Sequence, residues 1–360
     1  MSPKILIVGS TGKLGVKLLN YTFKNRIKVN AITCFNNLNK LNRQKTKFNI
    51  SKSFVLSKEN EYQKFLNFLK KPIDIIYFLD FGSSSLVYLE QFIKFNSNST
   101  IAIANKEMII AGGHLLMQKI KESKNKFIPL DSEHFSLQNS LINNNIKKVY
   151  ITASGGPFFF SKLNSFKQVS LNQVLAHPKW KMGMNNLIDS SNFINKILEI
   201  FELSIIYNIP INKVDFLISR QAFIHSVVLY EDGIVSLNCF KNDMLLPLIK
   251  PLSYYYDTKT NINSEISLFY NENFNLKKNE DNRFKFFKYY KKMKNLNHEK
   301  QIIFMVLNNL AQSLYLSKNL NYDDIIDFIM KNIDKYKYKK KIRDIKDVVG
   351  FIDQIKKSFK

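Results

Sequence analysis

The chain has 360 residues, of which 45% are hydrophobic and 13% aromatic, so it can bury a large core and wholesale disorder is excluded. The length suits two or three domains. No uncharged apolar run approaches the roughly 18 to 20 residues that span a bilayer. Two cysteines, Cys34 and Cys239, cannot make a disulfide framework, and no signal peptide precedes the first strand. We therefore expect a cytoplasmic protein.

The formal net charge of +25 raises the question of nucleic-acid binding. Only five of the 54 basic residues are Arg, which base-reading proteins favour for its two-pronged hydrogen bonding. The lysines are scattered among Asn, Ile and Phe along the whole chain. We expect a solvated basic surface with no nucleic-acid or membrane partner, whose positive field favours small anionic ligands.

Strand-length apolar runs alternate with helical stretches in the first part of the chain. Strands are expected at 4–8, 29–33, 73–79 and 100–104, and the first helix is expected to end near Asn25. This alternation is typical of parallel β-α-β units. We predict an α/β fold whose N-terminal domain, residues 1–130, is a Rossmann-like, doubly wound nucleotide-binding domain.

The pattern changes further along the chain. Strands are expected at 127–130 and 148–152, a helix at 193–207, and a hairpin of 224–230 and 234–237 around an Glu-Asp-Gly turn. We predict a central α+β catalytic domain over 131–256, an Asn- and Lys-rich linker over 257–281, and a C-terminal helical domain over 282–360. In this last segment, apolar residues recur every three or four positions from Ile342 to Ile355, which predicts an amphipathic helix.

A glycine-rich turn follows the first strand, with Gly9, Gly12 and Gly15 at the start of the first helix. In dinucleotide-binding folds, one such glycine makes the tight turn, one lets the backbone approach a pyrophosphate, and one lets the helix pack close to the strand. The free N–H groups of the helix then face the anion. The alternative is a glycine turn with no ligand.

The end of the second strand indicates which nicotinamide cofactor the domain takes. NAD enzymes place an Asp or Glu there for the ribose 2′-hydroxyl, and this carboxylate would repel the 2′-phosphate of NADP. Here the strand continues as Cys34-Phe35-Asn36-Asn37, and no acidic residue occurs before Glu59. The basic residues within reach of the turn are Lys40, Arg43, Lys45 and Lys47. We predict a preference for NADPH over NADH of at least about tenfold.

Two carboxylates, Asp131 and Glu133, follow the strand expected at 127–130. If the strand geometry persists, its two-residue period points both to one side. Two hard oxygen ligands, with a third carboxylate from elsewhere, suit Mg²⁺ or Mn²⁺. The alternative is a solvated acidic turn.

Two small-residue loops come next. Ser154-Gly155-Gly156 offers a hydroxyl and bare backbone N–H groups to an anion, although it could be a simple turn. Trp180 is the only tryptophan and lies between Pro178 and Gly183, which indicates a mobile loop with an apolar lid. The alternative for Trp180 is a place in the core.

The segment from Asp189 is expected to open a helix, with Ser190 or Ser191 as its N-cap. Asn195, Lys196 and Glu199 would share one face of that helix. A hydroxyl, an amide, an ammonium and a carboxylate on one face could bind a phosphate and a metal ion. The alternative is an ordinary amphipathic helix.

Together and in this order, these motifs closely resemble the 1-deoxy-D-xylulose 5-phosphate reductoisomerase family. The resemblance covers about residues 4–245. It rests on the glycine loop, A-I-A-N-K-E at 102–107, D-S-E-H at 131–134, T-A-S-G-G-P-F at 152–158, H-P-x-W-x-M-G at 177–183 and D-S-x-x-x-x-N-K-x-x-E at 189–199. The family rearranges its substrate with a divalent metal and reduces the resulting aldehyde with NADPH, giving 2-C-methyl-D-erythritol 4-phosphate for non-mevalonate isoprenoid synthesis.

The resemblance implies roles for the matched residues, and a homodimer. The implied metal ligands are Asp131, Glu133 and Glu199. The implied catalytic residues are Lys106, Glu133 and His177. The implied substrate contacts are Ser132, Ser154, His177, Ser190, Asn195 and Lys196, with Trp180 and Met182 on a closing flap. The implied cofactor contacts are Gly9, Ser10, Thr11, Gly12, Leu14, Asn36, Asn105, Glu107 and Gly183.

Some positions depart from the family pattern. Ser219–Ala222 and Asn238–Met244 differ, the C-terminal signature is barely visible around Leu307–Gln312, and the family often has Arg or Lys at position 36. We expect these changes to affect stability and turnover more than the reaction. Two rivals remain: another NADP-linked dehydrogenase, which would not need the paired carboxylates, and a decayed, non-catalytic binding protein, which would not need the matched residues.

Overall fold

The computed structural model of the chain describes residues 2–141, 145–159, 161, 166–177, 183–258, 275–278, 281–337 and 341–359. The chain divides into two compact units. Unit 1 comprises Met1–Met108, His114–Phe135 and Asp243–Asn263, and unit 2 comprises Ile109–Gly113, Ser136–Asn242 and Ser264–Lys360. Within the described ranges, no helix is both long enough and apolar enough to cross a membrane.

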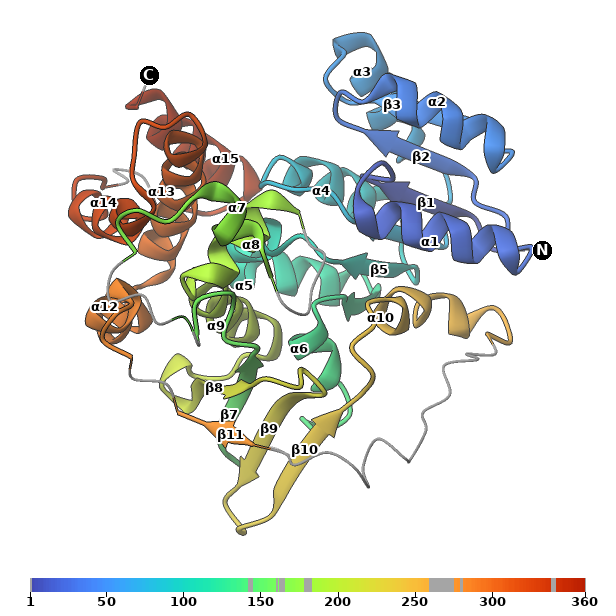
Figure 1. Ribbon diagram of the computed structural model, residues 1–360. Coiled ribbons are helices and arrows are strands. Elements are labelled where there is room, and N and C mark those ends of the chain that lie inside the picture. The colour runs from blue at the N-terminus through green and yellow to red at the C-terminus, as the bar shows by residue number, and fades with distance from the viewer. Residues whose placement is uncertain are drawn as a thin grey trace. The chain divides into compact units, whose positions relative to one another are not determined.

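Unit 1 is built on a parallel sheet of six strands in the order β3-β2-β1-β4-β5-β6 (Figure 1). The strands are β1 (Ile5–Val8), β2 (Ala31–Cys34), β3 (Lys52–Val55), β4 (Ile75–Phe78), β5 (Thr100–Ile103) and β6 (Lys126–Pro129). This order confirms the predicted Rossmann-like topology. The strand order reverses between β1 and β4, and ligands bind at the carboxyl ends of the strands beside such a switch point.

Burial explains which strands the sequence revealed. All four residues of β1, β2, β4 and β5 are buried, and these strands are apolar except for Thr33 in β2 and Thr100 in β5, as expected for inner strands of a parallel sheet. The edge strand β3 begins with an exposed and a half-buried residue. Its short, partly polar sequence gave no strand signal, and β3 was not predicted.

Helices connect the strands of unit 1: α1 (Lys13–Lys24), α2 (Leu38–Lys47), α3 (Glu59–Phe68), α4 (Ser85–Phe95) and α5 (Lys106–Glu122). The first helix ends at Asn25, its C-cap, as predicted. A later segment carrying α10 (Leu245–Ile249) returns to this unit. It is held there by an ion pair between Lys17 and Asp243 and by a hydrogen bond of 3.0 Å from the Tyr77 hydroxyl to the Leu248 carbonyl.

Unit 2 contains a mixed sheet of five strands in the order β10-β9-β7-β8-β11. They are β7 (Ile146–Ala153), β8 (Val214–Ser219), β9 (Ile224–Tyr230), β10 (Val235–Cys239) and β11 (Leu276–Lys277). β7 and β8 are parallel, and the other neighbours are antiparallel. The predicted hairpin is therefore confirmed, and the mixed sheet fits the predicted α+β class.

Helix α6 (Ser132–Ser136) lies in unit 1 up to Phe135. The helices of unit 2 are α7 (Leu171–Leu175), α8 (Met184–Ser191), α9 (Ile194–Tyr207), α12 (Lys285–Lys294), α13 (His298–Leu316), α14 (Ile325–Asn332) and α15 (Ile345–Lys357). Short 3₁₀ turns cover Ile211–Lys213, Leu252–Tyr254 and Tyr322–Asp324. The C-terminal part is helical as predicted, and α13 packs against α14 and α15. The last helix starts at Ile345 because Asp344 and Asp347 form a capping box.

Candidate active site

The glycine turn after β1 has the geometry of a phosphate loop. Gly9 has a φ of +82°, and a Cβ there would lie 2.5 Å from the backbone nitrogen of Asp80. A Cβ at Gly15 would lie 2.4 Å from the Ser10 carbonyl oxygen, so α1 can approach the turn only with glycine here. Gly12 is the N-cap of α1 and supplies no capping side chain. No capping side chain therefore competes with an anion at the N-terminus of this helix.

Hydrogen bonds fix this loop on β2 and α2. The Ser10 hydroxyl donates to Gln44 Oε1 (2.8 Å) and to the Thr33 carbonyl (3.1 Å). Gln44 Nε2 donates in return to the Ser10 carbonyl (2.8 Å). Ser10 thus uses its side chain to position the loop. Of the other predicted cofactor residues here, Gly12 is exposed, and Thr11 and Leu14 are half-buried.

A buried acidic group lies beside the phosphate loop. Asn105 caps α5 by accepting from the Met108 N–H (3.0 Å), and its Nδ2 donates to the Gly82 carbonyl (2.9 Å) and to Asp80 Oδ1 (3.4 Å). Burial raises the pKa of Asp80 to about 6, although hydrogen bonds from Ser85 and Asn105 oppose the shift. Burial also raises the pKa of Glu107. Asp80 was not predicted, and its only signal was an acidic residue at the end of an apolar strand.

The carboxylate cluster of unit 1, defined as Lys106, Asp131, Ser132, Glu133 and His134, follows β5 and β6. Asp131 lies 3.5 Å from Lys106 Nζ and 3.1 Å from His134 Nδ1, and accepts the Glu133 N–H at 3.2 Å. The Ser132 hydroxyl donates to Glu133 Oε2 at 2.7 Å. The prediction that strand alternation aligns Asp131 with Glu133 is wrong, because β6 ends at Pro129 and α6 begins at Ser132.

The polar cluster of unit 2, defined as Ser154, His177, Asn195, Lys196 and Glu199, combines the end of β7 with the start of α9. Lys196 Nζ donates to the Thr152 carbonyl (2.7 Å) and pairs with Glu199. Asn195 Nδ2 donates to the other oxygen of Glu199. These contacts confirm that Asn195, Lys196 and Glu199 share one helical face. That face is buried, which an amphipathic surface helix would not show.

The Ser154 hydroxyl and His177 Nε2 lie 3.1 Å apart in this polar cluster. Burial and, to a smaller extent, the positive charge of Lys196 together lower the pKa of His177 to about 4. His177 is therefore neutral near pH 7. A neutral imidazole and a hydroxyl beside a lysine can bind an anion without adding a second fixed positive charge.

The segment around Ser190 differs from the prediction. Asp189, Ser190 and Ser191 belong to the last turn of α8, so neither serine is the N-cap of α9. Phe193 is that N-cap, with a φ of +68°, and Asn192 Oδ1 accepts the Ile194 N–H at 3.0 Å. The N-cap thus falls two or three residues later than predicted. A Cβ at Gly156 would lie 2.7 Å from the Ser190 carbonyl, so the glycine loop after β7 packs closely on the end of α8.

The remaining predicted residues are placed as follows. Asn36 is exposed in the loop after β2, and Gly183 is the exposed N-cap of α8. Trp180 and Met182 lie outside the described residues, and the flap stays a prediction.

The fold and these two clusters are typical of a dinucleotide-binding α/β enzyme whose second unit carries a buried group of polar and charged side chains. A family model described as the 1-deoxy-D-xylulose 5-phosphate reductoisomerase C-terminal domain matches residues 127–207. The reductoisomerase of that name from Pelagibacter ubique is 32% identical over 98% of this chain and 97% of its own. The chain belongs to the 1-deoxy-D-xylulose 5-phosphate reductoisomerase family.

Solved structures show the same fold. The Zymomonas mobilis reductoisomerase in complex with NADPH aligns with a TM-score of 0.82 and 22% identity, covering 99% of this chain and 97% of that one. A DOX-P reductoisomerase in complex with NADPH, fosmidomycin and magnesium aligns with a TM-score of 0.85 and 21% identity over the same shares. The likeness therefore extends through the C-terminal helices, where the sequence carried little recognisable signal.

Proposed function

We propose that this chain catalyses the NADPH- and divalent-metal-dependent rearrangement and reduction of 1-deoxy-D-xylulose 5-phosphate to 2-C-methyl-D-erythritol 4-phosphate. The observation that carries the proposal is family membership over 98% of the chain, joined to intact clusters of the residue types that this reaction needs. A dehydrogenase that transfers only hydride would have no use for buried carboxylates and lysines gathered in this way.

The phosphate loop fits NADPH, which supplies the hydride when bound. The open N-terminus of α1 suits a pyrophosphate, and the tight contacts of Gly9 and Gly15 keep the loop in that shape. Thr11, Gly12 and Leu14 would contact the cofactor, with Asn36 toward its ribose and Asn105, Glu107 and Gly183 toward its nicotinamide end. The absence of an acidic residue after β2 favours the 2′-phosphorylated form.

Asp131, Glu133 and Glu199 fit a divalent metal, since carboxylate oxygens are the ligands that Mg²⁺ and Mn²⁺ prefer. The ion would polarise the carbonyl of the substrate and bind its neighbouring oxygen. Two of these carboxylates are already oriented by neighbours: Glu133 by the Ser132 hydroxyl, and Glu199 by Asn195 and Lys196. Orientation of ligands by such contacts lowers the cost of arranging them when the ion binds.

The polar cluster of unit 2 would bind the substrate phosphate. Lys196 offers a positive charge, Ser154, Ser190 and Asn195 offer neutral donors, and the loop at Gly155–Gly156 offers backbone N–H groups. His177, neutral near pH 7, can donate one hydrogen bond without strong repulsion from Lys196. Binding energy from this non-reacting phosphate can drive closure of the loop with Trp180 and Met182, which excludes water.

Lys106 and Ser132 would contact the carbon backbone of the substrate. The Lys106 ammonium is buried beside Asp131, where it can donate a hydrogen bond to a substrate hydroxyl. Glu133 would accept a hydrogen bond from the substrate as well as bind the metal. We further infer a cytoplasmic homodimer without nucleic-acid or membrane partners. Sedimentation of the purified chain would test the dimer.

Measurement of NADPH absorbance with 1-deoxy-D-xylulose 5-phosphate and Mg²⁺ tests the proposal. We expect consumption of NADPH that depends on both substrate and metal, with 2-C-methyl-D-erythritol 4-phosphate identified by mass spectrometry. Loss of NADPH without this product would indicate another dehydrogenase. No consumption at all in a folded sample that binds NADPH would indicate a non-catalytic protein.

A further inference from the structure

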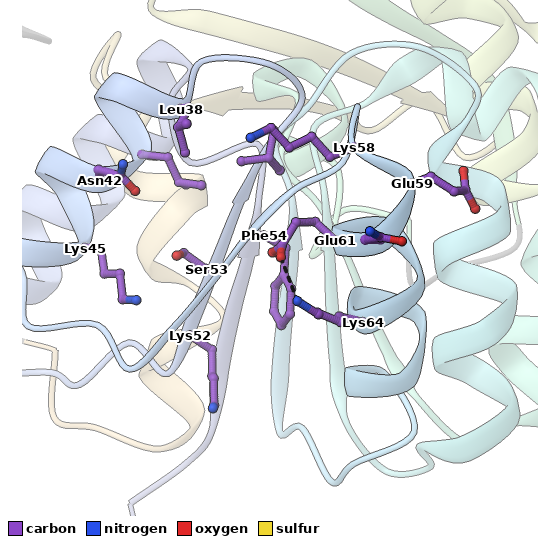
Figure 2. A pocket seen from close by; sticks show the side chains of 13 residues that line it. Leu38, Asn42, Lys45, Lys52, Ser53, Phe54, Lys58, Glu59, Glu61 and Lys64 are labelled. Atoms are coloured by element: carbon purple, nitrogen blue, oxygen red, sulfur yellow. Dashed lines mark hydrogen bonds and ion pairs between the residues drawn. The ribbon is translucent and has the colours of Figure 1, made fainter.

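A pocket of about 790 Å³ lies at the edge of the sheet in unit 1, between α2, β3 and the start of α3 (Figure 2). Leu38 and Lys58 line the end of the pocket that lies at the carboxyl ends of β2 and β3. Lys45 lines it from α2, and Lys52 lines it at the opposite end of β3. The pocket is therefore basic, and one of its ends lies beside the loop that meets the ribose of a bound dinucleotide in this fold.

Backbone hydrogen bonds hold Lys58 against that loop. The Leu56 N–H donates to the Cys34 carbonyl at 2.8 Å, and the Ser57 N–H donates to the Phe35 carbonyl at 2.9 Å. These bonds continue the pairing of β2 with β3 beyond the strands themselves. Lys58 is the next residue, and its own N–H donates to the Val55 carbonyl at 3.1 Å. Its position beside Phe35 and Asn36 is thus fixed by the backbone.

The Lys58 ammonium is available to bind an anion beside the loop after β2. Its side chain is exposed and makes no ion pair with another described residue. The two nearby acidic side chains are engaged within α3, because Glu59 accepts from Gln63 at 2.8 Å and Glu61 pairs with Lys64 at 3.1 Å. Figure 2 shows the Lys58 side chain extending from the loop before α3 toward Leu38, the first residue of α2.

Two of the other cations predicted for this role, Lys45 and Lys47, are less well placed. Lys47 is the last residue of α2, and its ammonium lies over the Phe48 ring at 5.1 Å. Lys45 is seven residues from Leu38, about 10 Å along a helix that rises about 1.5 Å per residue. Lys40, in the first turn of α2, is the strongest rival. The loop of Phe35, Asn36 and Asn37 itself carries no charge.

Phe35 provides a second group that suits a nucleotide, next to the cation of Lys58. Its side chain is 68% exposed, although it is large and apolar and directly follows a buried strand. An exposed aromatic ring can stack on a nucleobase. An aromatic platform and a cation on adjacent, hydrogen-bonded loops match the two ends of an adenosine 2′-phosphate.

We propose that Lys58 binds the 2′-phosphate of NADPH and that Phe35 stacks on its adenine. The inference rests on the proposed function for its ligand and adds the residues that select this ligand. The family often has Arg or Lys at position 36, in the loop after β2, where this chain has the uncharged Asn36. The inference places the cation that selects NADPH in the loop after β3 instead. Asn36 then contributes an amide contact to the same group.

Calorimetric titration of the full chain with adenosine 2′,5′-bisphosphate and with adenosine 5′-monophosphate tests this proposal. These probes differ only in the 2′-phosphate and need no turnover. We expect Lys58→Gln to weaken binding of the bisphosphate at least tenfold and to change binding of the monophosphate less than twofold. Phe35→Ala should weaken both probes by similar factors. Lys52→Gln, which removes an equal charge at the other end of the pocket, is the matched control and should change either affinity less than twofold.

Three results would overturn the inference: an unchanged bisphosphate affinity in Lys58→Gln, an equal loss in Lys52→Gln, or the selective loss in Lys40→Gln instead. Unchanged binding of both probes by Phe35→Ala would contradict the stacking of Phe35 on the adenine. A different result would contradict the proposed function. A chain that binds the bisphosphate through Lys58 but does not convert the pentulose phosphate would contradict the reaction and leave this inference standing.

Discussion

Asn308 on α13 donates from Nδ2 to both carboxylate oxygens of Asp189 on α8, at 3.1 and 3.0 Å. Gln312, one turn further along α13, donates to the same carboxylate at 2.5 Å. All three side chains are at most 5% exposed. The two amides therefore fix the end of α8 that carries Ser190, on which the glycine loop after β7 packs closely.

Replacement of Asn308 by Leu should destabilise the chain. Leu is similar in size but cannot donate, so part of a buried carboxylate loses its partner, which typically costs about 1–3 kcal/mol. We expect the free energy of unfolding in urea to fall by about that amount, and the KM for the pentulose phosphate to rise as Ser190 shifts. Ser313→Ala, at an exposed position on the same helix, is the control. Equal stability of Asn308→Leu and Ser313→Ala would contradict this role.

Glu199→Gln tests the third metal ligand. The change keeps the size of the side chain and a hydrogen bond from Asn195, but removes the charge that a divalent ion needs. Loss of a ligand commonly costs several kcal/mol of transition-state stabilisation, so kcat/KM should fall by about 10²-fold or more. The Mg²⁺ concentration for half-maximal activity should rise, while NADPH binding, followed by fluorescence, stays intact. Exposed Glu231→Gln should match the wild type, and normal Mg²⁺ dependence in Glu199→Gln would exclude the ligand role.

Asp80→Asn should stabilise the chain at neutral pH. The pKa of Asp80 is raised from 3.8 to about 6 by burial, so the folded state keeps its proton when the unfolded state has lost it. Stability is therefore lost as pH rises from about 4 to 6, by on the order of 2–3 kcal/mol. Asparagine removes this loss, so the variant should be more stable at pH 8 and nearly equal to the wild type at pH 4. Urea unfolding across this range, with exposed Asp353→Asn as control, would reveal the difference. A pH-independent difference would rule out titration of Asp80 as its cause.

His177 should have the opposite effect on stability. Its pKa is lowered from 6.5 to about 4, first by burial and then by Lys196, so the unfolded state takes up a proton before the folded state does. Stability is lost as pH falls from 6.5 to 4, by on the order of 1–2 kcal/mol after allowance for solvent screening. His177→Gln should flatten this part of the pH profile, whereas exposed His114→Gln should leave it unchanged. An unaltered profile in His177→Gln would contradict the lowered pKa.

The sequence predicts the inner strands of unit 1 well because burial on both faces makes each a largely apolar run. It does not predict β3, whose first residues face solvent at the sheet edge. The residue types of both clusters could also be predicted, but the local geometry could not. Asp131 and Glu133 are aligned by the start of a helix and not by a strand, and Ser190 ends a helix that it was predicted to open.

Long-range contacts explain the rest of the difference. Asn308 and Asp189 are 119 residues apart, and no local pattern connects them. Asp80 has a raised pKa because the fold buries it, with the turn at Gly9 packed against its backbone. Lys58 follows β3, an edge strand that was not predicted, and the pairing of β3 with β2 brings Lys58 to the end of β2. In each case a residue acquires its role from a partner supplied by the fold.

The most direct test of the proposed reaction is a single assay of purified chain with 1-deoxy-D-xylulose 5-phosphate, NADPH and Mg²⁺. NADPH absorbance is followed over time, and the product is identified by mass spectrometry. We predict one 2-C-methyl-D-erythritol 4-phosphate for each NADPH consumed, with the reaction stopped by a chelator and restored by added Mg²⁺ or Mn²⁺. Consumption of NADPH that persists in excess chelator, or that yields a different product, would contradict the account.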